Sequence, residues 1–332
     1  MSLFIGKKNN KTSVQFHIDR ALHGLHTPPC NIWDAHIHIW DAVSYSEFEK
    51  WAEVYGVHRY TGIAAPEVKR ALEHRGKADR FSFALYLPMD AFALHDTNRL
   101  LSAVEEAREH GYAMVKMWFG PRFLDSSDAN KPFAISLPEF DQVFSRIEEY
   151  ALPIDVHVAD PDIWYRRKYL DVKRYRTKRQ AIDEFVTVLE RHPTLRAISV
   201  HFGSLPEPEN LPLLDSLLDK YSNLYVDTAS TKWIVRELGR EPEKARKFII
   251  KYQKRILFAS DLSVGWGDEA DGYYAKLYWA QRLFWETKVK NVALPFPDDD
   301  NEHKSTDING LNLPQNVLEN LYWKNAQNFF QL

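Results

Sequence analysis

The sequence predicts one α/β domain folded as a (β/α)8 TIM barrel behind an N-terminal arm. Eight short runs rich in β-branched and aromatic residues alternate with longer segments of helical period, which is the pattern of a parallel sheet. Several of these runs end in a histidine or an aspartate. The 332 residues exceed the roughly 250 of a typical single core. One large barrel or two modest domains would fit that length, and the strand count favours the barrel.

The first 30 residues differ from the rest. Residues 1–30 are polar and irregular and end in Thr27-Pro28-Pro29-Cys30, so we expect an arm here and a barrel over residues 31–332. The apolar stretch at the start of the chain is too short for a secretory signal or a membrane span. We therefore expect a cytoplasmic protein that does not bind membranes.

The expected strands begin directly after the arm and recur along the chain. They span residues 32–40, 60–65, 81–87, 113–119, 154–158, 197–202, 224–227 and 256–259. A doubly wound open sheet would give the same alternation of strands and helices. However, no glycine-rich phosphate-binding turn follows any strand, and the chain has only 13 glycines, so a nucleotide-phosphate site is not supported.

Helices are expected in the segments between these strands. Residues 99–110 and 182–191 each carry an apolar stripe of helical spacing. Ser136, two residues before a proline, predicts a capped helix start. A polar loop over 295–314 should lead into a closing helix over 314–330.

Composition limits the chemistry. The single cysteine, Cys30, excludes an internal disulfide and any multi-cysteine zinc or iron–sulfur site, so a metal would need histidine and carboxylate ligands. The formal net charge of −3 argues against a nucleic-acid binder. A small-molecule substrate is the expected partner.

Ligand-type residues gather at the ends of four strands. His36 and His38 are two residues apart on the first strand, so both rings project to one side. His157, His201 and Asp261 end the fifth, sixth and eighth strands. In a barrel these ends face one mouth, where active sites are built. Packing could explain any one of these residues, but it explains the whole set poorly.

These motifs resemble those of the amidohydrolase superfamily, specifically its amidohydrolase-2 branch of metal-dependent hydrolases and decarboxylases. The resemblance covers roughly residues 31 to 330. It rests on Asp34-Ala35-His36-Ile37-His38 followed by Trp40-Asp41, on the later strand-end residues, and on Asn325-Ala326 in the last helix. Further similar stretches are residues 158–161, 237–240 and 248–253.

The resemblance implies that His36, His38 and His157 bind one divalent metal, with Asp261 as a fourth ligand or as a base on bound water. His201 would face the substrate and, if protonated, stabilise an oxyanion. Zinc suits such ligands and can generate hydroxide near neutral pH. We therefore expect a hydrolase in which metal-bound hydroxide attacks a small, anionic ester, lactone or amide.

Two alternatives stay open. The same ligands would serve a non-oxidative decarboxylase of an aromatic or unsaturated acid, and a barrel without catalysis could act as a metal-binding interaction module. Lys116, on the fourth strand, could bridge a second metal as a carboxylated lysine does in binuclear members, although an ordinary pairing with a carboxylate is the favoured interpretation. The resemblance also allows a homodimer.

Substrate contacts are less well defined by the sequence. Arg166 and Arg167 lie in a basic, tyrosine-containing loop after the fifth strand, which could recruit an anion or form a solvated basic surface. Trp40 and Trp118 could line the pocket or cap the core. Asp160 could contact substrate or begin a loop before a proline.

Overall fold

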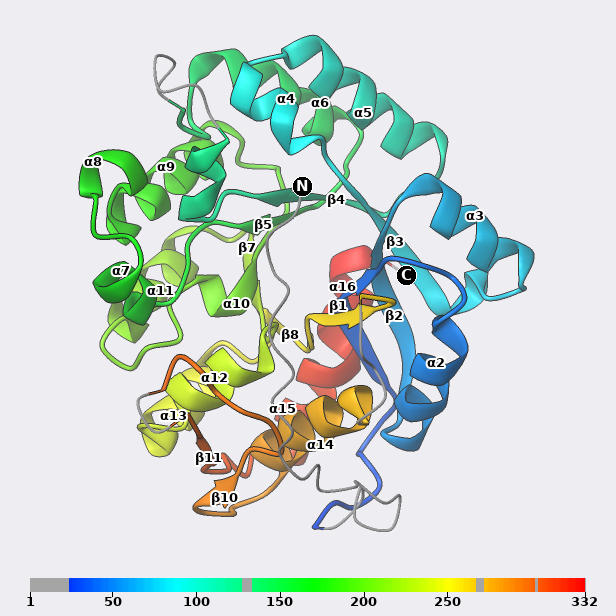
Figure 1. Cartoon of the computed structure of the whole chain (residues 1–332), viewed down its shortest axis with the longest axis vertical. Coiled ribbons are helices and arrows are strands. Elements are labelled where there is room, and N and C mark those ends of the chain that lie inside the picture. Colours follow the sequence, from blue (N-terminus) through cyan, green and yellow to red (C-terminus); the bar gives the residue numbers. More distant parts are fainter. Residues whose placement is uncertain (1–23, 127–132, 267–271, 302–303, 332) are drawn as a thin grey trace.

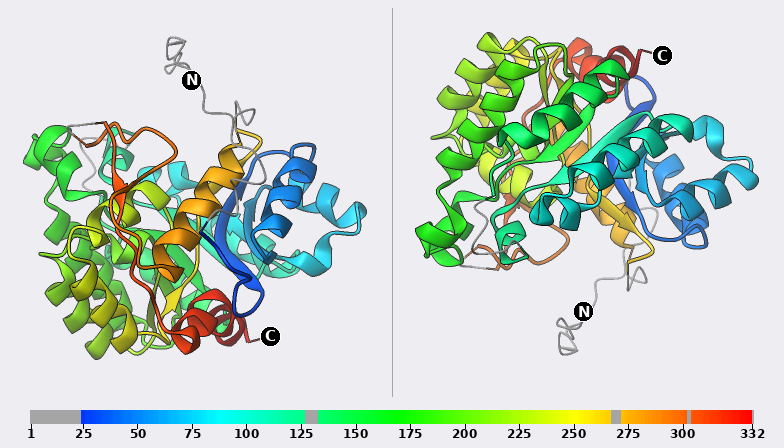
Figure 2. Two further views of the ribbon diagram at one scale, coloured as in Figure 1. Left: turned by 90° about the horizontal axis from the view of Figure 1, so that it is seen from below. Right: turned by 90° about the horizontal axis from the view of Figure 1, so that it is seen from above.

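A computed structural model describes residues 24–126, 133–266, 272–301 and 304–331. Parallel strands form the centre and helices surround them (Figures 1 and 2). The strands are β1 (Ile32–Ile39), β2 (Val57–Ala64), β3 (Phe81–Tyr86), β4 (Met114–Trp118), β5 (Ile154–His157), β6 (Ala197–Ser199), β7 (Leu224–Asp227), β8 (Ile256–Leu257) and β9 (Leu262–Val264). A separate antiparallel pair joins β10 (Val292–Ala293) to β11 (Asp307–Ile308).

The central sheet is closed by a divided eighth strand. Strands β1 to β8 are paired in chain order, and β9 pairs in parallel with the free side of β1. β8 and β9 are consecutive pieces of one segment, interrupted at residues 258–261. Across the interruption, the backbone N–H of Ala35 donates to Phe258 and that of Asp261 donates to His36, at 2.8 and 2.9 Å. The predicted TIM-like barrel is thus confirmed, with its last strand shorter than expected.

Helices follow the strands and cover the sheet. The α-helices are α2 (Tyr45–Val54), α3 (Pro66–His74), α4 (Met89–Leu94), α5 (Thr97–Glu109), α6 (Asp141–Glu149), α7 (Asp162–Arg167), α8 (Val172–Tyr175), α9 (Lys178–Arg191), α10 (Val200–Gly203), α11 (Leu211–Lys220), α12 (Thr231–Leu238), α13 (Pro242–Lys251), α14 (Tyr273–Glu286), α15 (Gln315–Glu319) and α16 (Asn325–Phe330). Short 3₁₀ segments span Ala78–Arg80, Pro121–Asp125 and Pro138–Phe140, and a π-turn over Asn320–Lys324 joins α15 to α16.

Local sequence explains several helix starts. Asp96 caps α5 by accepting a hydrogen bond from the backbone of Arg99, and Thr177 with Gln180 forms a capping box on α9. The predicted cap at Ser136 is wrong. Leu137, the residue before the proline, takes the N-cap place of the short 3₁₀ turn, because a residue before proline is driven into an extended conformation. The predicted loop over 295–314 also contains β11.

The C-terminal helix α16 covers the end of the barrel at which β1 begins. Trp33 from β1 packs with Leu257 from β8 and with Phe329 from α16 in one buried cluster, and its ring stacks on Phe330 at 5.3 Å. The opposite end, where the strands terminate, is left for a site. Residues 1–23 of the predicted arm lie outside the described residues. Among the helices that are described, none is long and apolar enough to cross a membrane.

Candidate active site

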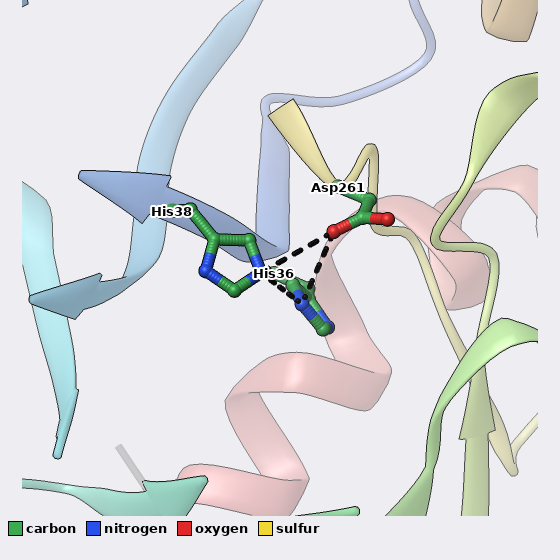
Figure 3. Close-up of side chains that lie close together, drawn as sticks. All are labelled: His36, His38 and Asp261. Atoms are coloured by element: carbon green, nitrogen blue, oxygen red, sulfur yellow. Dashed lines mark hydrogen bonds and ion pairs between the residues drawn. The ribbon is translucent and has the colours of Figure 1, made fainter. Parts of the chain in front are cut away.

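Three side chains meet at the open end of the barrel. Nε2 of His36 lies 3.3 Å from Nε2 of His38. Oδ1 of Asp261 lies 3.5 Å from the first and 3.4 Å from the second. Figure 3 shows the three groups pointing toward one another, with the second carboxylate oxygen of Asp261 turned away from both rings. The result is a compact triangle of one oxygen and two nitrogen donors.

A bulge in β1 aims both histidines inward. Asp34 pairs with Tyr60, but Ile37 pairs with Gly62, so β1 carries one extra residue over this interval. Ala35 packs in the inner cluster below the site, whereas Ile37 packs in the outer core. The bulge therefore lets Ala35 and the next residue, His36, both face the interior, as bulges near active sites often do.

Asp34 holds the interrupted eighth strand in place. Its carboxylate accepts hydrogen bonds from the backbone and hydroxyl of Ser260 and from the hydroxyl of Tyr278. Burial raises the pKa of Asp34 to about 7, although these hydrogen bonds oppose the shift. The neighbouring Asp261 has a left-handed backbone with φ of 61°. Asp34, the first residue of the motif that contains His36 and His38, thus positions the carboxylate of Asp261, which comes from a distant segment of the chain.

The second nitrogen of His36 faces two buried carboxylates. Nδ1 lies 3.2 Å from Oδ2 of Asp155 and 3.2 Å from Oδ2 of Asp227. Burial lowers the pKa of His36 to about 3, so its ring is neutral. A proton on Nδ1, facing the carboxylates, leaves the lone pair of Nε2 directed at the triangle.

Lys116 forms an ion pair with Asp155, one of the two carboxylates that face His36. Lys116 is 2% exposed, and its Nζ is 2.8 Å from Oδ1 of Asp155. The strand register places these two residues side by side on β4 and β5. His36, Asp155 and Asp227 could themselves hold a cation, but that set is fully buried and Lys116 already neutralises part of its charge. The triangle in the mouth is therefore the more suitable metal site.

The triangle has suitable dimensions for a bound metal. Metal–ligand distances of about 2.0–2.1 Å in a tetrahedral site separate neighbouring donor atoms by about 3.3–3.4 Å, close to the three observed separations. Desolvation would raise the pKa of Asp261, but the hydrogen bond from His38 lowers it, and the net pKa lies below its usual range. An ionised carboxylate and neutral imidazole are the forms that bind metals.

His157 and His201 form a separate chain of contacts in the same mouth. Nε2 of His201 lies 2.9 Å from Nδ1 of His157, whose Nε2 lies 2.8 Å from Asp160. Asp160 also accepts a hydrogen bond of 2.6 Å from Tyr169. Both nitrogens of His157 are thus engaged, and it does not join the triangle. Burial, and then the proximity of His157, lowers the pKa of His201 well below its usual value, which favours a neutral ring.

A left-handed turn presents His201 to the mouth. The strand β6 ends at Ser199, earlier than predicted, and His201, Phe202, Gly203 and Ser204 have φ of 56°, 58°, 68° and 60°. Such a conformation costs roughly 1–2 kcal/mol for each residue other than glycine. Asp227 offsets part of this cost by accepting a hydrogen bond of 2.8 Å from the backbone of His201.

A cavity of about 590 Å³ opens above these residues. His157, Asp160, His201 and Asp261 line it together with Trp118. Five further aromatic or cationic side chains on its walls are Trp164, Trp233, Arg122, Lys232 and Arg236. This volume would hold a small organic molecule.

The other predicted substrate contacts lie elsewhere. Trp40 is 49% exposed and stacks on the ring of His38 at 5.8 Å. Arg166 and Arg167 line a neighbouring cavity of about 900 Å³ rather than the one above the triangle. Several cations of the basic loop are paired with acids, as in the contact of Lys168 with Asp300. These pairs agree with the interpretation of the loop as a basic surface.

The fold and site define a (β/α) barrel with a candidate metal centre at the carboxyl ends of its strands. The family model described as Amidohydrolase matches residues 33–332. The chain therefore belongs to this amidohydrolase family, which confirms the resemblance seen in its motifs. No curated protein matches the sequence.

Solved structures share the fold at low sequence identity. The 2,6-dihydroxybenzoate decarboxylase from Rhizobium is 15% identical, with a TM-score of 0.53, and covers 91% of this chain and 99% of its own. A protein from Acinetobacter baumannii assigned as a 2-pyrone-4,6-dicarboxylic acid hydrolase is 10% identical, with a TM-score of 0.52, covering 91% and 100%. A dihydroxybenzoic acid decarboxylase from Polaromonas with bound manganese and 2-nitroresorcinol is 14% identical, with a TM-score of 0.52, covering 91% and 97%.

Sequence reasoning missed the residues that support the site. Asp155 precedes His157 by two positions and therefore shares its side of β5, which is a signal that the sequence contains. Asp227 ends β7 as the other site residues end their strands. Trp233 and Arg236 come from a helix, and nothing in its sequence distinguishes their roles from packing.

Proposed function

We propose that this protein is a metal-dependent hydrolase that acts on a small, anionic ester, lactone or amide. The observation that carries the proposal is the triangle of His36, His38 and Asp261 beneath an open cavity. Asp261 also lines the cavity of about 590 Å³ that contains His201, and we propose that water and substrate reach the triangle through it. The bound metal is proposed to be zinc, because the donor spacing fits a tetrahedral site.

A divalent cation held there would polarise a carbonyl group and lower the pKa of a water molecule. Asp261 directs Oδ1 at the two histidines, which leaves Oδ2 to accept a proton from the attacking water. Asp227 and Asp155 fix the orientation of His36. His201 lies beside this group, with its ring 6.1 Å from that of His36, and is proposed to contact the reacting carbonyl.

Proton transfer away from the site can use the second chain of contacts. His201, His157 and Asp160 are linked by distances of 2.9 and 2.8 Å between ring nitrogens and the carboxylate. A neutral His201 could accept a proton while Asp160 stabilises the resulting charge on His157. In this proposal His157 supports His201. Its alternative role as a third metal ligand would require its ring to leave Asp160.

With a divalent cation bound, the charges that line the cavity would favour an anionic substrate. Arg122, Lys232 and Arg236 face the cavity together with Asp125, Asp160, Asp261 and Asp300. Addition of a divalent cation would turn this near balance into a net positive charge. Trp118, Trp164 and Trp233 provide flat apolar surfaces, so a substrate that contains a ring is favoured.

Decarboxylation of an aromatic acid is the second candidate. The aromatic walls support it, and the Rhizobium and Polaromonas proteins of the same fold are named as decarboxylases of dihydroxybenzoic acids. The same metal would then position the substrate carboxylate. Manganese, bound in the Polaromonas structure, is the corresponding alternative to zinc.

The test combines metal analysis with a divided substrate panel. Protein purified without chelator should contain one divalent metal per chain, and a chelator should abolish activity that added zinc restores. A panel of aryl lactones and esters should give hydrolysis products, whereas aryl carboxylates should release no carbon dioxide. Asp261→Asn should lower kcat by about 10²–10⁴-fold, and the surface control Asp219→Asn should match the wild type.

Three results would contradict the hydrolase. Release of carbon dioxide without hydrolysis would favour the decarboxylase. Turnover that survives both metal removal and Asp261→Asn would exclude the triangle as the catalytic centre. Absence of all turnover despite a full equivalent of metal would favour the interaction module.

A further inference from the structure

Helix α12 places two buried donors on the wall of the mouth cavity. Trp233 is 4% exposed and Arg236 is 9% exposed, and both line the cavity that contains His201 and Asp261. They are three positions apart, so they occupy the same face of the helix, about 5–6 Å apart at Cβ. Neither residue is needed for the metal triangle or for its supporting carboxylates.

Each residue has a polar atom without a partner. The indole Nε1 of Trp233 and Nη2 of Arg236 are buried and have no hydrogen-bond partner among the residues that the structure describes. A buried donor left unpaired costs about 1–3 kcal/mol, and such groups are few in native proteins. Two of them on one helix face, both beside one cavity, indicate an acceptor that enters from outside the chain.

The rest of the Arg236 guanidinium is fixed by acidic partners. Nη1 lies 2.8 Å from each oxygen of Asp298, which is itself fully buried, and Nε donates to Glu237 at 2.8 Å. These bonds orient the group and leave Nη2 as its unpaired nitrogen. Lys232 and Arg122 add two further cations to the same cavity, and Asp125, Asp160, Asp261 and Asp300 add carboxylates, so Nη2 lies in a setting of mixed charge.

The donors are close to the reaction centre without belonging to it. The ring of Trp233 lies 5.5 Å from the ring of His201, which lies 6.1 Å from the ring of His36. A small ring-containing molecule bound at the triangle would therefore extend toward α12. A carboxylate offers two acceptor oxygens, one for Nη2 of Arg236 and one for the indole N–H of Trp233.

We infer that Trp233 and Arg236 form a second anion subsite, which binds a carboxylate of the substrate remote from the reacting group. The inference rests on the proposed function only in taking the mouth as the catalytic site, and it applies equally to hydrolysis and decarboxylation. It makes the substrate a small ring compound that carries a carboxylate in addition to the group that reacts.

Equilibrium binding tests the subsite without any turnover. Isothermal titration calorimetry on the zinc-loaded protein would compare isophthalate, which has two carboxylates, with benzoate, which has one. Wild type should bind isophthalate at least about 10-fold more tightly, since a hydrogen bond to a charged group contributes about that factor. Trp233→Phe keeps the ring and removes the N–H, so the preference should fall about 10-fold.

A matched control and a second variant keep the test decisive. Trp51, 8% exposed, donates its indole N–H to Glu47 far along the chain from α12, so Trp51→Phe should retain the wild-type preference. Arg236→Lys keeps the positive charge but removes the planar guanidinium, and it should also reduce the preference for isophthalate. This variant keeps the test available if Trp233→Phe fails to fold.

The outcomes separate this inference from the proposed function. Equal affinities for the two ligands in wild type, or an unchanged preference in both variants, would overturn the subsite even if the enzyme hydrolyses its panel. Loss of the preference in the variants would support the subsite even if no turnover of lactones or carboxylates is found.

Discussion

Replacement of Lys116 by methionine distinguishes its two interpretations. Its side chain is 3% exposed and its ammonium contacts Asp155, which is fully buried, at 2.8 Å. Asp227 lies in the same interior, with its pKa raised to about 7 by burial although Lys116 opposes the shift. Methionine has a similar length but no charge, so Lys116→Met would leave buried carboxylates without their cation.

The expected cost follows from the burial of both partners. Removal of one member of a buried ion pair typically destabilises a protein by about 3–5 kcal/mol, whereas replacement of both members by apolar residues can be nearly neutral. We therefore expect Lys116→Met to lower the free energy of unfolding by about 3–5 kcal/mol. The double variant Lys116→Met/Asp155→Leu should recover a large part of that loss, although His36 then depends on Asp227 alone.

The assay is urea denaturation of the three proteins together with their metal content. If Lys116 is the counter-ion of Asp155, wild type and Lys116→Met should each hold one metal per chain and differ in stability. A stability change below about 1 kcal/mol, with the metal content falling from two equivalents to one, would refute the counter-ion role. That result would support the bridge between two metals.

Two further predictions concern the thiol and two glycines. Burial, and then the nearby Glu319, raise the pKa of Cys30 to about 11. Alkylation by iodoacetamide should therefore be about 100-fold slower at pH 8 than for a thiol of ordinary pKa, and the alkylation rate should keep rising above pH 10. A plateau of this rate near pH 9 would contradict the raised pKa. A Cβ on Gly265, where φ is +82°, would lie 1.8 Å from the carboxylate of Asp41, whereas one on Gly76, where φ is +69°, would meet nothing within 4 Å. Gly76→Ala should therefore cost about 1 kcal/mol for the left-handed backbone alone, and Gly265→Ala should cost clearly more in urea denaturation; equal losses would show that the steric argument fails.

The sequence predicts the barrel because hydrophobic periodicity and strand spacing are local properties. The same locality identifies the strand-end residues, and His36, His38 and Asp261 do meet. The bulge that turns His36 inward cannot be predicted in this way, because it arises from a mismatch of register between β1 and β2. The left-handed turn at His201 is stabilised by a hydrogen bond that the His201 backbone N–H donates to Asp227, 26 positions away.

The environment of each predicted residue is also beyond a local pattern. The sequence suggests His157 as a ligand by its position at a strand end, but its neighbours in space, Asp160 and His201, occupy both of its ring nitrogens. The unpaired donors of α12 are recognised only once the partners of every other polar group are known. Pattern thus predicts where chemistry is located, and packing decides which atoms are available for it.

The divided eighth strand gives the metal triangle a role in folding. Asp34 and Ser260, hydrogen-bonded where β1 meets the divided strand, are separated by 226 positions, so two segments far apart in the sequence must meet before the barrel is complete. Joining such distant segments costs loop-closure entropy. A cation bound by His36, His38 and Asp261 would link the two segments and so offset part of this cost. A ligand that binds only the folded state adds to its stability. The free energy of unfolding of the barrel would therefore increase with the concentration of the metal.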